Sequence, residues 1–225
     1  MPWWAHKMPR KFSGRFYFSQ MKNIKNIIFD LGNVLIDIDY DKTIDAFEQL
    51  GFKNFKSTYS PYKMDALFEN VETGRISEEE FYNSIKSLSK NPLSTAQIKN
   101  AWNALLLSFR TESLAFLKQL APKYNLYLLS NTNSIHLTAF DEIFLRDTGE
   151  ISLDSYFIKA YYSNLIGLRK PDEEVYAFVL NDAGIIATET LFIDDLANNI
   201  EGAKSLGIHT HLLLPHERIE QLQII

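Results

Sequence analysis

A short apolar run that stops at an acid is the feature that most constrains how this chain folds. The run Ile27-Ile28-Phe29 ends at Asp30, and Leu31-Gly32-Asn33 then leads into a second apolar run, Val34-Leu35-Ile36. This pattern predicts a buried strand with Asp30 at its carboxyl end. That edge of an open α/β sheet is where ligands bind, although Asp also commonly ends strands for reasons of turn chemistry alone.

Composition narrows the classes of protein that fit. The 225 residues are 46% hydrophobic, enough for one packed core with an elaboration. The 23 basic and 28 acidic residues give a net charge of −5, which argues against a nucleic-acid binder but leaves room for a small anionic ligand. The absence of cysteine excludes disulfides, thiolate metal sites and a Cys nucleophile.

The chain also lacks an apolar run near the roughly 18 residues that a transmembrane helix needs. We therefore expect no membrane contact and a cytoplasmic location. Residues 1–21 are basic and aromatic and lack the apolar core of a secretory signal. We interpret them as a loosely attached N-terminal arm or an over-extended start before Met21; a segment that packs on a partner is the alternative.

About seventy residues after Ile36 carry helical patterns. Ser77-Glu78-Glu79-Glu80 and Ser94-Thr95-Ala96-Gln97 are capping boxes that start two helices. The second helix would continue through an apolar stripe of Ile98, Ala101, Trp102, Leu105 and Leu106. We therefore predict an all-helical insertion over residues 39–108, with the core made of residues 22–38 and 109–225.

Strand and helix patterns alternate from Thr111 onward, which predicts a parallel sheet. Polar groups follow the later strands at Ser130, at the loop Gly167-Leu168-Arg169-Lys170-Pro171 and at Asp194-Asp195. Parallel topology would bring all of them to the edge that carries Asp30.

Each of these polar groups also has an ordinary structural interpretation. Ser130 could bond to local backbone, Lys170 could be a solvated loop residue, and the paired acids could form a turn or a helix N-cap. Two adjacent carboxylates at the end of a buried strand nevertheless repel each other, and a bound cation would relieve that repulsion.

The four segments, in this order, resemble the haloacid dehalogenase-like (HAD) superfamily of hydrolases. The resemblance runs from Lys22 to the C-terminus, and the helical insertion resembles the C1 type of cap. The motifs are most similar to a bacterial subgroup that includes glucose-1-phosphate phosphatases. The resemblance implies an α/β fold: a Rossmann-like parallel sheet core with an inserted all-helical cap.

The resemblance also implies a role for each motif. Asp30 would be the nucleophile that forms an aspartyl phosphate, Ser130 and the N–H of Asn131 would hold phosphoryl oxygens, and Lys170 would stabilise charge. Mg²⁺ would be held by Asp30, the carbonyl of Gly32 and Asp195, with Asp194 beside them.

Two further residues receive roles as neighbours of these motifs. Asn199 lies four residues after Asp195 and would orient the acidic pair. Arg75, in a predicted cap turn, is a candidate substrate contact or simply an exposed arginine.

One position departs from the superfamily pattern. The second residue after the nucleophile is usually an acid–base aspartate, and here it is Gly32, which cannot transfer a proton. We favour a phosphatase for a small phosphorylated metabolite such as a sugar phosphate. Its substrate would have a good leaving group, or the enzyme would use an acid from elsewhere in the chain. Asp37 and Asp39 are nearby, but turn or cap structure suits them better. The alternatives are a catalytically weak phospho-ligand-binding or regulatory protein and, third, a 2-haloacid dehalogenase.

Overall fold

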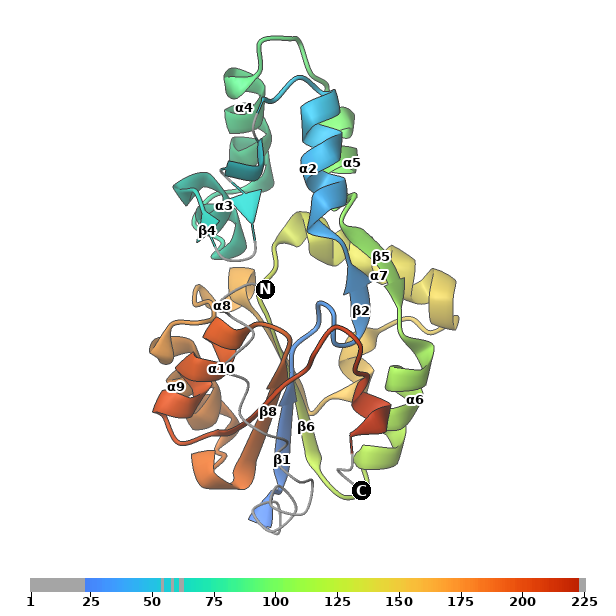
Figure 1. Cartoon of the computed structure of the whole chain (residues 1–225), viewed down its shortest axis with the longest axis vertical. Coiled ribbons are helices and arrows are strands. Elements are labelled where there is room, and N and C mark those ends of the chain that lie inside the picture. The colour runs from blue at the N-terminus through green and yellow to red at the C-terminus, as the bar shows by residue number, and fades with distance from the viewer. Residues whose placement is uncertain (1–22, 54, 58, 61–62, 223–225) are drawn as a thin grey trace, which may run out of the picture.

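A five-stranded parallel sheet forms the centre of the computed structural model, which describes residues 23–53, 55–57, 59–60 and 63–222. The strand order is β7-β6-β1-β8-β9, so β1 lies in the middle (Figure 1). The strands are β1 (Asn26–Phe29), β6 (Asn125–Ser130), β7 (Lys159–Tyr162), β8 (Thr190–Asp194) and β9 (His209–Leu212). The predicted arm over residues 1–21 lies outside the described residues.

Helices cover both faces of this sheet. Ile27 and Phe29 of β1 pack into one apolar cluster with α6 (Thr111–Leu120) and α7 (Ser134–Thr148). Ile28 packs on the opposite face with α9 (Glu173–Ala183) and α10 (Ala197–Ser205). A strand buried on both faces is uniformly apolar, as β1 is. The predicted Rossmann-like parallel core is confirmed.

Short helices complete the core. They are α8 (Ser163–Ile166), which follows β7, and the 3₁₀ helices η4 (Leu153–Tyr156), η5 (Ala187–Glu189) and η6 (Ile219–Gln221). No helix in the described part of the chain combines the length and the apolar character that crossing a membrane would require.

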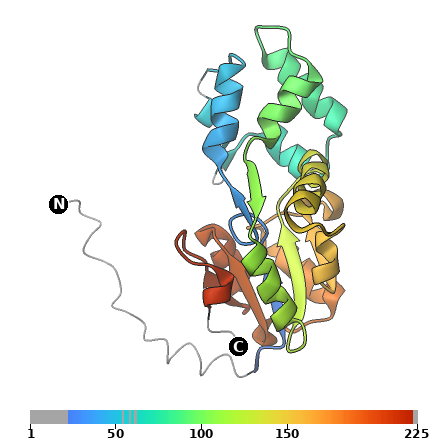
Figure 2. The same cartoon turned by 90° about the vertical axis from the view of Figure 1, so that its right-hand side faces the viewer.

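The insertion stands above the carboxyl edge of the sheet (Figures 1 and 2). Its helices are α2 (Tyr40–Gln49), α3 (Ala66–Glu72), α4 (Glu78–Leu88) and α5 (Thr95–Asn103). The capping boxes predicted at Ser77 and Ser94 are both present. Trp102 is fully buried at the centre of an aromatic cluster that joins these helices.

The insertion is not purely helical, which the sequence patterns missed. A 3₁₀ helix η3 (Phe55–Ser57) precedes a hairpin of β3 (Tyr59–Ser60) and β4 (Lys63–Met64). The apolar stripe of α5 also stops early, because Leu106 begins strand β5 (Leu106–Phe109) and pairs with Ile38 of β2 (Ile36–Ile38). Hydrogen bonding between distant segments decides the outcome there, and local periodicity cannot reveal it.

The antiparallel pair β2–β5, which we call the ribbon, carries the chain into and out of the insertion (Figure 2). The predicted boundary at residue 38/39 falls at the end of β2, and the one at 108/109 falls within β5. We propose that residues 39–108 form a cap on the core, and we call this segment the cap.

A buried histidine joins the cap to the core. The His136 ring of α7 stacks on Trp102 with a centroid separation of 5.0 Å. Its Nε2 lies 3.1 Å from the Trp102 carbonyl, and its Nδ1 lies 3.1 Å from the Asn133 side-chain amide nitrogen. The orientation of the Asn133 amide is fixed, because its Oδ1 accepts from the His136 backbone N–H and from the Trp102 indole N–H. The ring is therefore the neutral tautomer, with Nε2 donating and Nδ1 accepting.

We expect acid to destabilise the protein through this ring. Burial lowers the pKa of His136 from 6.5 to about 4. The unfolded chain takes up the proton at a higher pH than the folded protein does. The free energy of unfolding is therefore unaffected above pH 6.5, and it falls by about 2 to 3 kcal/mol as the pH drops from 6.5 towards 4. Urea unfolding of His136→Gln at pH 7.5 and 4.5 should show a smaller acid loss than wild type. His216→Gln, which changes an exposed ring, should keep the wild-type loss; equal losses in all three proteins would contradict the assignment.

Candidate active site

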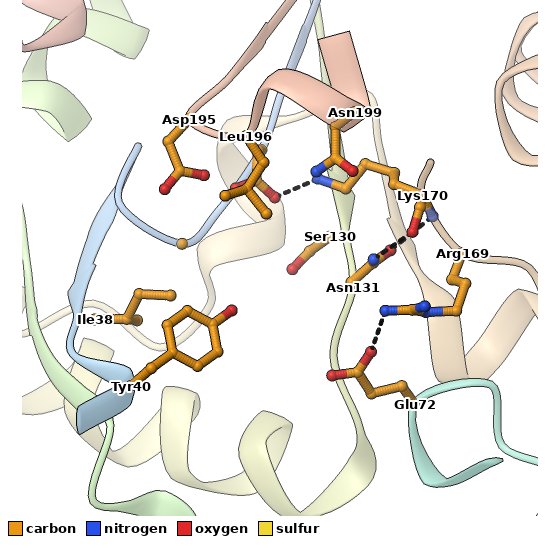
Figure 3. A pocket seen from close by; sticks show the side chains of 12 residues that line it. Ile38, Tyr40, Glu72, Ser130, Asn131, Arg169, Lys170, Asp195, Leu196 and Asn199 are labelled. Atoms are coloured by element: carbon orange, nitrogen blue, oxygen red, sulfur yellow. Dashed lines mark hydrogen bonds and ion pairs between the residues drawn. The ribbon is translucent and has the colours of Figure 1, made fainter. Parts of the chain in front are cut away.

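A pocket opens at the carboxyl edge of the sheet, beneath the cap, and encloses about 70 Å³. Strand β1 supplies Asp30 just after its end, and the following turn supplies Gly32. The other predicted residues that line the pocket are Ser130, Asn131, Lys170, Asp195 and Asn199 (Figure 3). The convergence predicted from parallel topology is present.

Lys170 lies at the base of this pocket and is almost completely buried, at 1% exposure. Its Nζ lies 2.5 Å from Oδ1 of Asp30 and 2.7 Å from Oδ2 of Asp194. Such short charge-assisted bonds fix all three side chains. The surface interpretation of Lys170 is wrong.

The Lys170 backbone is held as firmly as its side chain. The Asn131 amide donates to the Lys170 carbonyl and accepts from the Lys170 N–H, each at 2.9 Å. The side chain of Asn131 therefore positions Lys170, a contact that sequence reasoning did not predict. Ser130, the last residue of β6, turns its hydroxyl into the pocket (Figure 3).

Asp194 supports the site from below. It is wholly buried and lies outside the pocket lining, and its two oxygens each accept from the Asn199 amide at 3.0 Å. Asn199 thus orients Asp194, the first of the paired acids. Asp195 reaches the pocket and accepts from the Asn33 amide at 3.1 Å.

The site holds more negative charge than Lys170 can offset. Burial raises the pKa of Asp30 despite the attraction of Lys170, and the carboxylates of Asp194 and Asp195 raise it further. Burial and Asp194 raise the pKa of Asp195 to about 6. The burial of Lys170 itself lowers its pKa, but Asp194 and Asp30 outweigh that effect and hold the pKa above its usual value.

The donor set fits a hard divalent cation. Asp30, Asp194 and Asp195 each offer an oxygen within 4.8 Å of the others. Carboxylate oxygens are the ligands that Mg²⁺ prefers, and a second positive charge would balance the excess carboxylate.

The position of the missing acid is filled by an apolar side chain. A Cβ built on Gly32 would lie 2.8 Å from Cδ1 of Ile38 and 4.0 Å from Oδ2 of Asp30. Ile38 therefore occupies the space into which a side chain at position 32 would extend. Asp37 and Asp39 do not replace it: Asp37 pairs with Arg110 at 2.6 Å, and Asp39 caps α2 by accepting from the Asp41 N–H.

Three polar residues line the pocket without having been predicted to do so: Tyr40, Glu72 and Arg169. Glu72 had a detectable signal, because it lies four residues after the buried Phe68 and thus on the apolar face of α3. The cap arginine that was predicted, Arg75, is not among the lining residues. It is exposed and pairs with Glu69 at 3.4 Å.

Comparison with known families decides the assignment of the chain. The haloacid dehalogenase-like hydrolase family matches residues 24–207, which is most of the sequence. The chain belongs to the haloacid dehalogenase-like hydrolases. This hydrolase is 34% identical over 187 residues to the D-ribitol-5-phosphate phosphatase of Bacteroides thetaiotaomicron, a match that covers 83% of this chain and 90% of the relative.

Solved structures agree with this assignment. A HAD-family enzyme of Bacteroides thetaiotaomicron, solved as an Asp-to-Ala mutant with magnesium and inorganic phosphate, superposes with a TM-score of 0.82 at 35% identity. The match covers 88% of this chain and 98% of that one. L-2-haloacid dehalogenase from Xanthobacter autotrophicus superposes at 0.56 with 20% identity, covering 84% and 77%, and this likeness shows the fold alone.

We expect Lys170→Met to destabilise the hydrolase strongly. It removes the cation that Asp30 and Asp194 share, and breaking a buried ion pair costs about 3 to 5 kcal/mol. Denaturant unfolding at pH 7.5 measures the loss. Lys204→Met breaks an exposed ion pair with Glu201 and should change the free energy of unfolding little. Similar losses in the two variants would show that burial of the Lys170 pair adds nothing to stability.

Proposed function

We propose that this hydrolase is a magnesium-dependent phosphatase that releases phosphate from a small phosphorylated metabolite, with sugar and sugar-alcohol phosphates as the preferred class. The observation that carries the proposal is Asp30, bound to buried Lys170 and grouped with Asp195 in a pocket under the cap. The D-ribitol-5-phosphate phosphatase relative and the magnesium and phosphate complex support it.

In this proposal Asp30 attacks phosphorus and forms an aspartyl phosphate. Lys170, 2.5 Å from the Asp30 carboxylate, directs that carboxylate and offsets charge on the phosphoryl oxygens. Ser130 and the N–H of Asn131 hold the other oxygens. Water then releases phosphate from Asp30.

Asp30, the carbonyl of Gly32 and Asp195 would hold Mg²⁺, while Asp194 acts on the site through Lys170 and Asn199. When bound, the ion supplies positive charge that lessens the repulsion between the attacking carboxylate and the phosphoryl group. The group of Asp30, Asp194 and Asp195 argues against dehalogenation, because that reaction has no phosphoryl charge for a bound cation to offset. A weak phospho-ligand-binding protein is the remaining rival, because Gly32 carries no acid.

The first test is phosphate release from a panel of sugar phosphates, sugar-alcohol phosphates and p-nitrophenyl phosphate, with and without Mg²⁺. We expect turnover that depends on Mg²⁺ and that Asp30→Asn lowers by at least about 10³-fold, because the nucleophile is lost. The matched control is Asp45→Asn, which changes an exposed acid on α2 and should keep wild-type turnover.

Failure has a distinct result. A folded wild-type protein that binds Mg²⁺ and inorganic phosphate but turns over no phosphate ester would favour the binding-protein alternative. Chloride release from a 2-haloacid without Mg²⁺ would favour dehalogenation.

Metal binding has a readout that does not depend on activity. At 100 times its dissociation constant, Mg²⁺ should add about 2.7 kcal/mol of stability, a rise in melting temperature of roughly 5 °C or more for a chain of this size. Asp195→Asn should lose most of this rise, because it removes one carboxylate of the group. An equal rise in wild type and variant would place the bound ion elsewhere.

A further inference from the structure

The proposed phosphatase lacks a proton donor where its family usually carries one, and the structure shows where another carboxyl lies. Glu72, the last residue of α3, is 5% exposed and lines the same pocket as Asp30. Figure 3 shows Glu72 and Tyr40 on the cap side of the pocket, across from Asp195 and Lys170. A buried acid that faces the reaction site is unusual and requires a reason.

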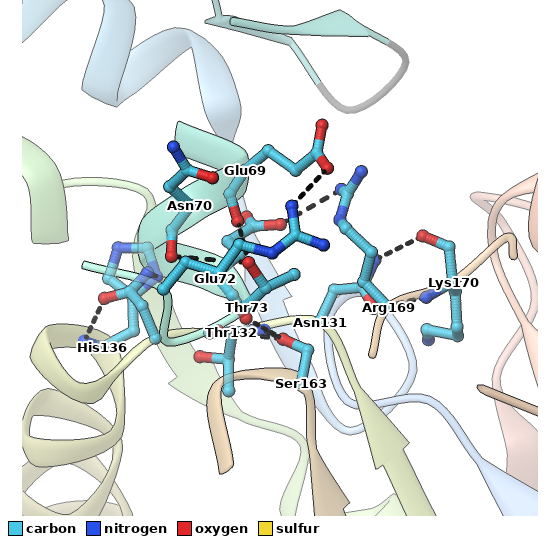
Figure 4. Close-up of polar contacts among 12 residues, drawn as sticks. Glu69, Asn70, Glu72, Thr73, Asn131, Thr132, His136, Ser163, Arg169 and Lys170 are labelled. Carbon is cyan, nitrogen blue, oxygen red and sulfur yellow. Dashed lines mark hydrogen bonds and ion pairs between the residues drawn. The ribbon is translucent and has the colours of Figure 1, made fainter. Parts of the chain in front are cut away.

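The backbone at Glu72 is fixed to the core. The Ser163 hydroxyl, at the start of α8, lies 2.6 Å from the Glu72 carbonyl (Figure 4). Two residues later Gly74 passes so close to α8 that an added Cβ would lie 2.3 Å from the Asn164 carbonyl. Gly74 also has a φ of +66°, which favours glycine. The cap turn therefore presents Glu72 to the pocket at a set height above the core.

The side chain is fixed as well. One carboxylate oxygen, Oε2, accepts from Nη2 of Arg169 at 3.1 Å. Among the described residues this is the only side chain bonded to the Glu72 carboxylate, and Figure 3 shows the second oxygen turned away from Arg169. Arg169 directly precedes Lys170, so the same loop positions the base of the pocket and the carboxyl above it.

Reaction geometry requires a donor on this side. In phosphoryl transfer the attacking and leaving oxygens lie roughly in line on opposite sides of phosphorus. Since Asp30 attacks from the core, the leaving oxygen points towards the cap. Glu72 is the carboxyl on that side, whereas Ile38 occupies the space beside Asp30 that an acid at position 32 would use.

The surroundings of Glu72 are compatible with both protonation states. Burial raises the pKa of Glu72, the attraction of Arg169 opposes this, Glu69 adds to the rise, and Lys170 subtracts from it. The Tyr40 phenol also faces the pocket and is neutral, because burial and the nearby Glu72 carboxylate raise its pKa far above the usual value. Burial, together with the neighbouring Tyr40 and Glu72, likewise raises the pKa of the Tyr59 phenol.

We propose that Glu72 is the general acid and base of this hydrolase, supplied by the cap in place of the acid missing at position 32. The inference rests on the proposed phosphatase function. As the Asp30 oxygen bonds to phosphorus and the ester P–O bond breaks, the leaving oxygen takes the proton of Glu72. Water then attacks the aspartyl phosphate and gives a proton to the Glu72 carboxylate, and the Asp30–phosphorus bond breaks. The net result is one alcohol, one phosphate and regenerated enzyme.

Glu72→Gln tests the proposal, because an amide can still accept from Arg169 but cannot donate an acidic proton. We expect single-turnover cleavage of a sugar-alcohol phosphate to fall by about 10²- to 10⁴-fold. First-turnover release of p-nitrophenol should stay within a few-fold of wild type, since nitrophenolate leaves without a proton. The second step still needs the base, so the variant should show a burst of one p-nitrophenol per active site followed by slow turnover.

Controls separate catalysis from folding and from substrate binding. Glu79→Gln changes an exposed acid on α4, a cap helix whose residues do not line the pocket, and should behave as wild type. Glu72→Asp keeps a carboxyl group on a shorter side chain, and it should give an intermediate rate that still depends on pH. Glu72→Gln should lose one limb of the pH profile of kcat. A variant that raises only KM for the sugar-alcohol phosphate would assign Glu72 to recognition and overturn the proposal.

Other outcomes would also overturn it. Equal single-turnover losses for the two substrates in Glu72→Gln, or wild-type rates in both Glu72 variants, would exclude Glu72 as the donor. Loss of the same pH limb in Tyr40→Phe alone would assign the proton to Tyr40. Each of these results requires an active wild-type phosphatase, so a wild-type protein without turnover would instead refute the proposed function.

Discussion

The site depends on one buried cation. Lys170 bonds to Asp30, which opens into the pocket, and to Asp194, which does not. Asn199 donates to the Asp194 carboxylate, and Asn131 donates to the Lys170 carbonyl. Because a lone buried lysine would be strongly disfavoured, the lysine and its two acids stabilise one another only as a set. The neighbouring strands β1 and β8 carry the two acids, and Asn131, which follows β6 on the other side of β1, holds the backbone of Lys170.

Residues at strand ends were predictable from sequence because topology determines where they meet. Asp30, Ser130 and Asp195 all follow apolar strands, and parallel pairing placed them at one edge without any knowledge of side-chain contacts. Lys170 was found through its motif, but its burial was not predicted, since nothing local distinguishes it from a solvated loop lysine.

Residues that reach the pocket from the cap were harder to predict. Glu72 and Tyr40 face it only because the cap folds back over the sheet. The helical spacing from Phe68 marks Glu72 as inward-facing, but it does not reveal that this face meets the pocket. Arg75 had the charge expected of a substrate contact, yet its side chain is exposed beside Glu69. The hairpin β3–β4 and the early end of α5 were missed for a related reason: they depend on pairing between segments, as when Leu106 joins Ile38.

The ribbon β2–β5 restricts how the cap can move. Both chain crossings lie side by side and are hydrogen-bonded to each other, at Ile36 with Phe109 and at Ile38 with Leu106. The hydrogen bonds between two paired strands fix their register and so resist sliding of one strand along the other. The cap is also held to the core at a second place, because the Ser163 hydroxyl lies 2.6 Å from the Glu72 carbonyl, so the ribbon and this contact together keep Glu72 over the pocket. A movement that opened the cap would have to break the Ser163–Glu72 contact, and it would withdraw Glu72 while Asp30, Ser130 and Lys170 stayed in place on the core.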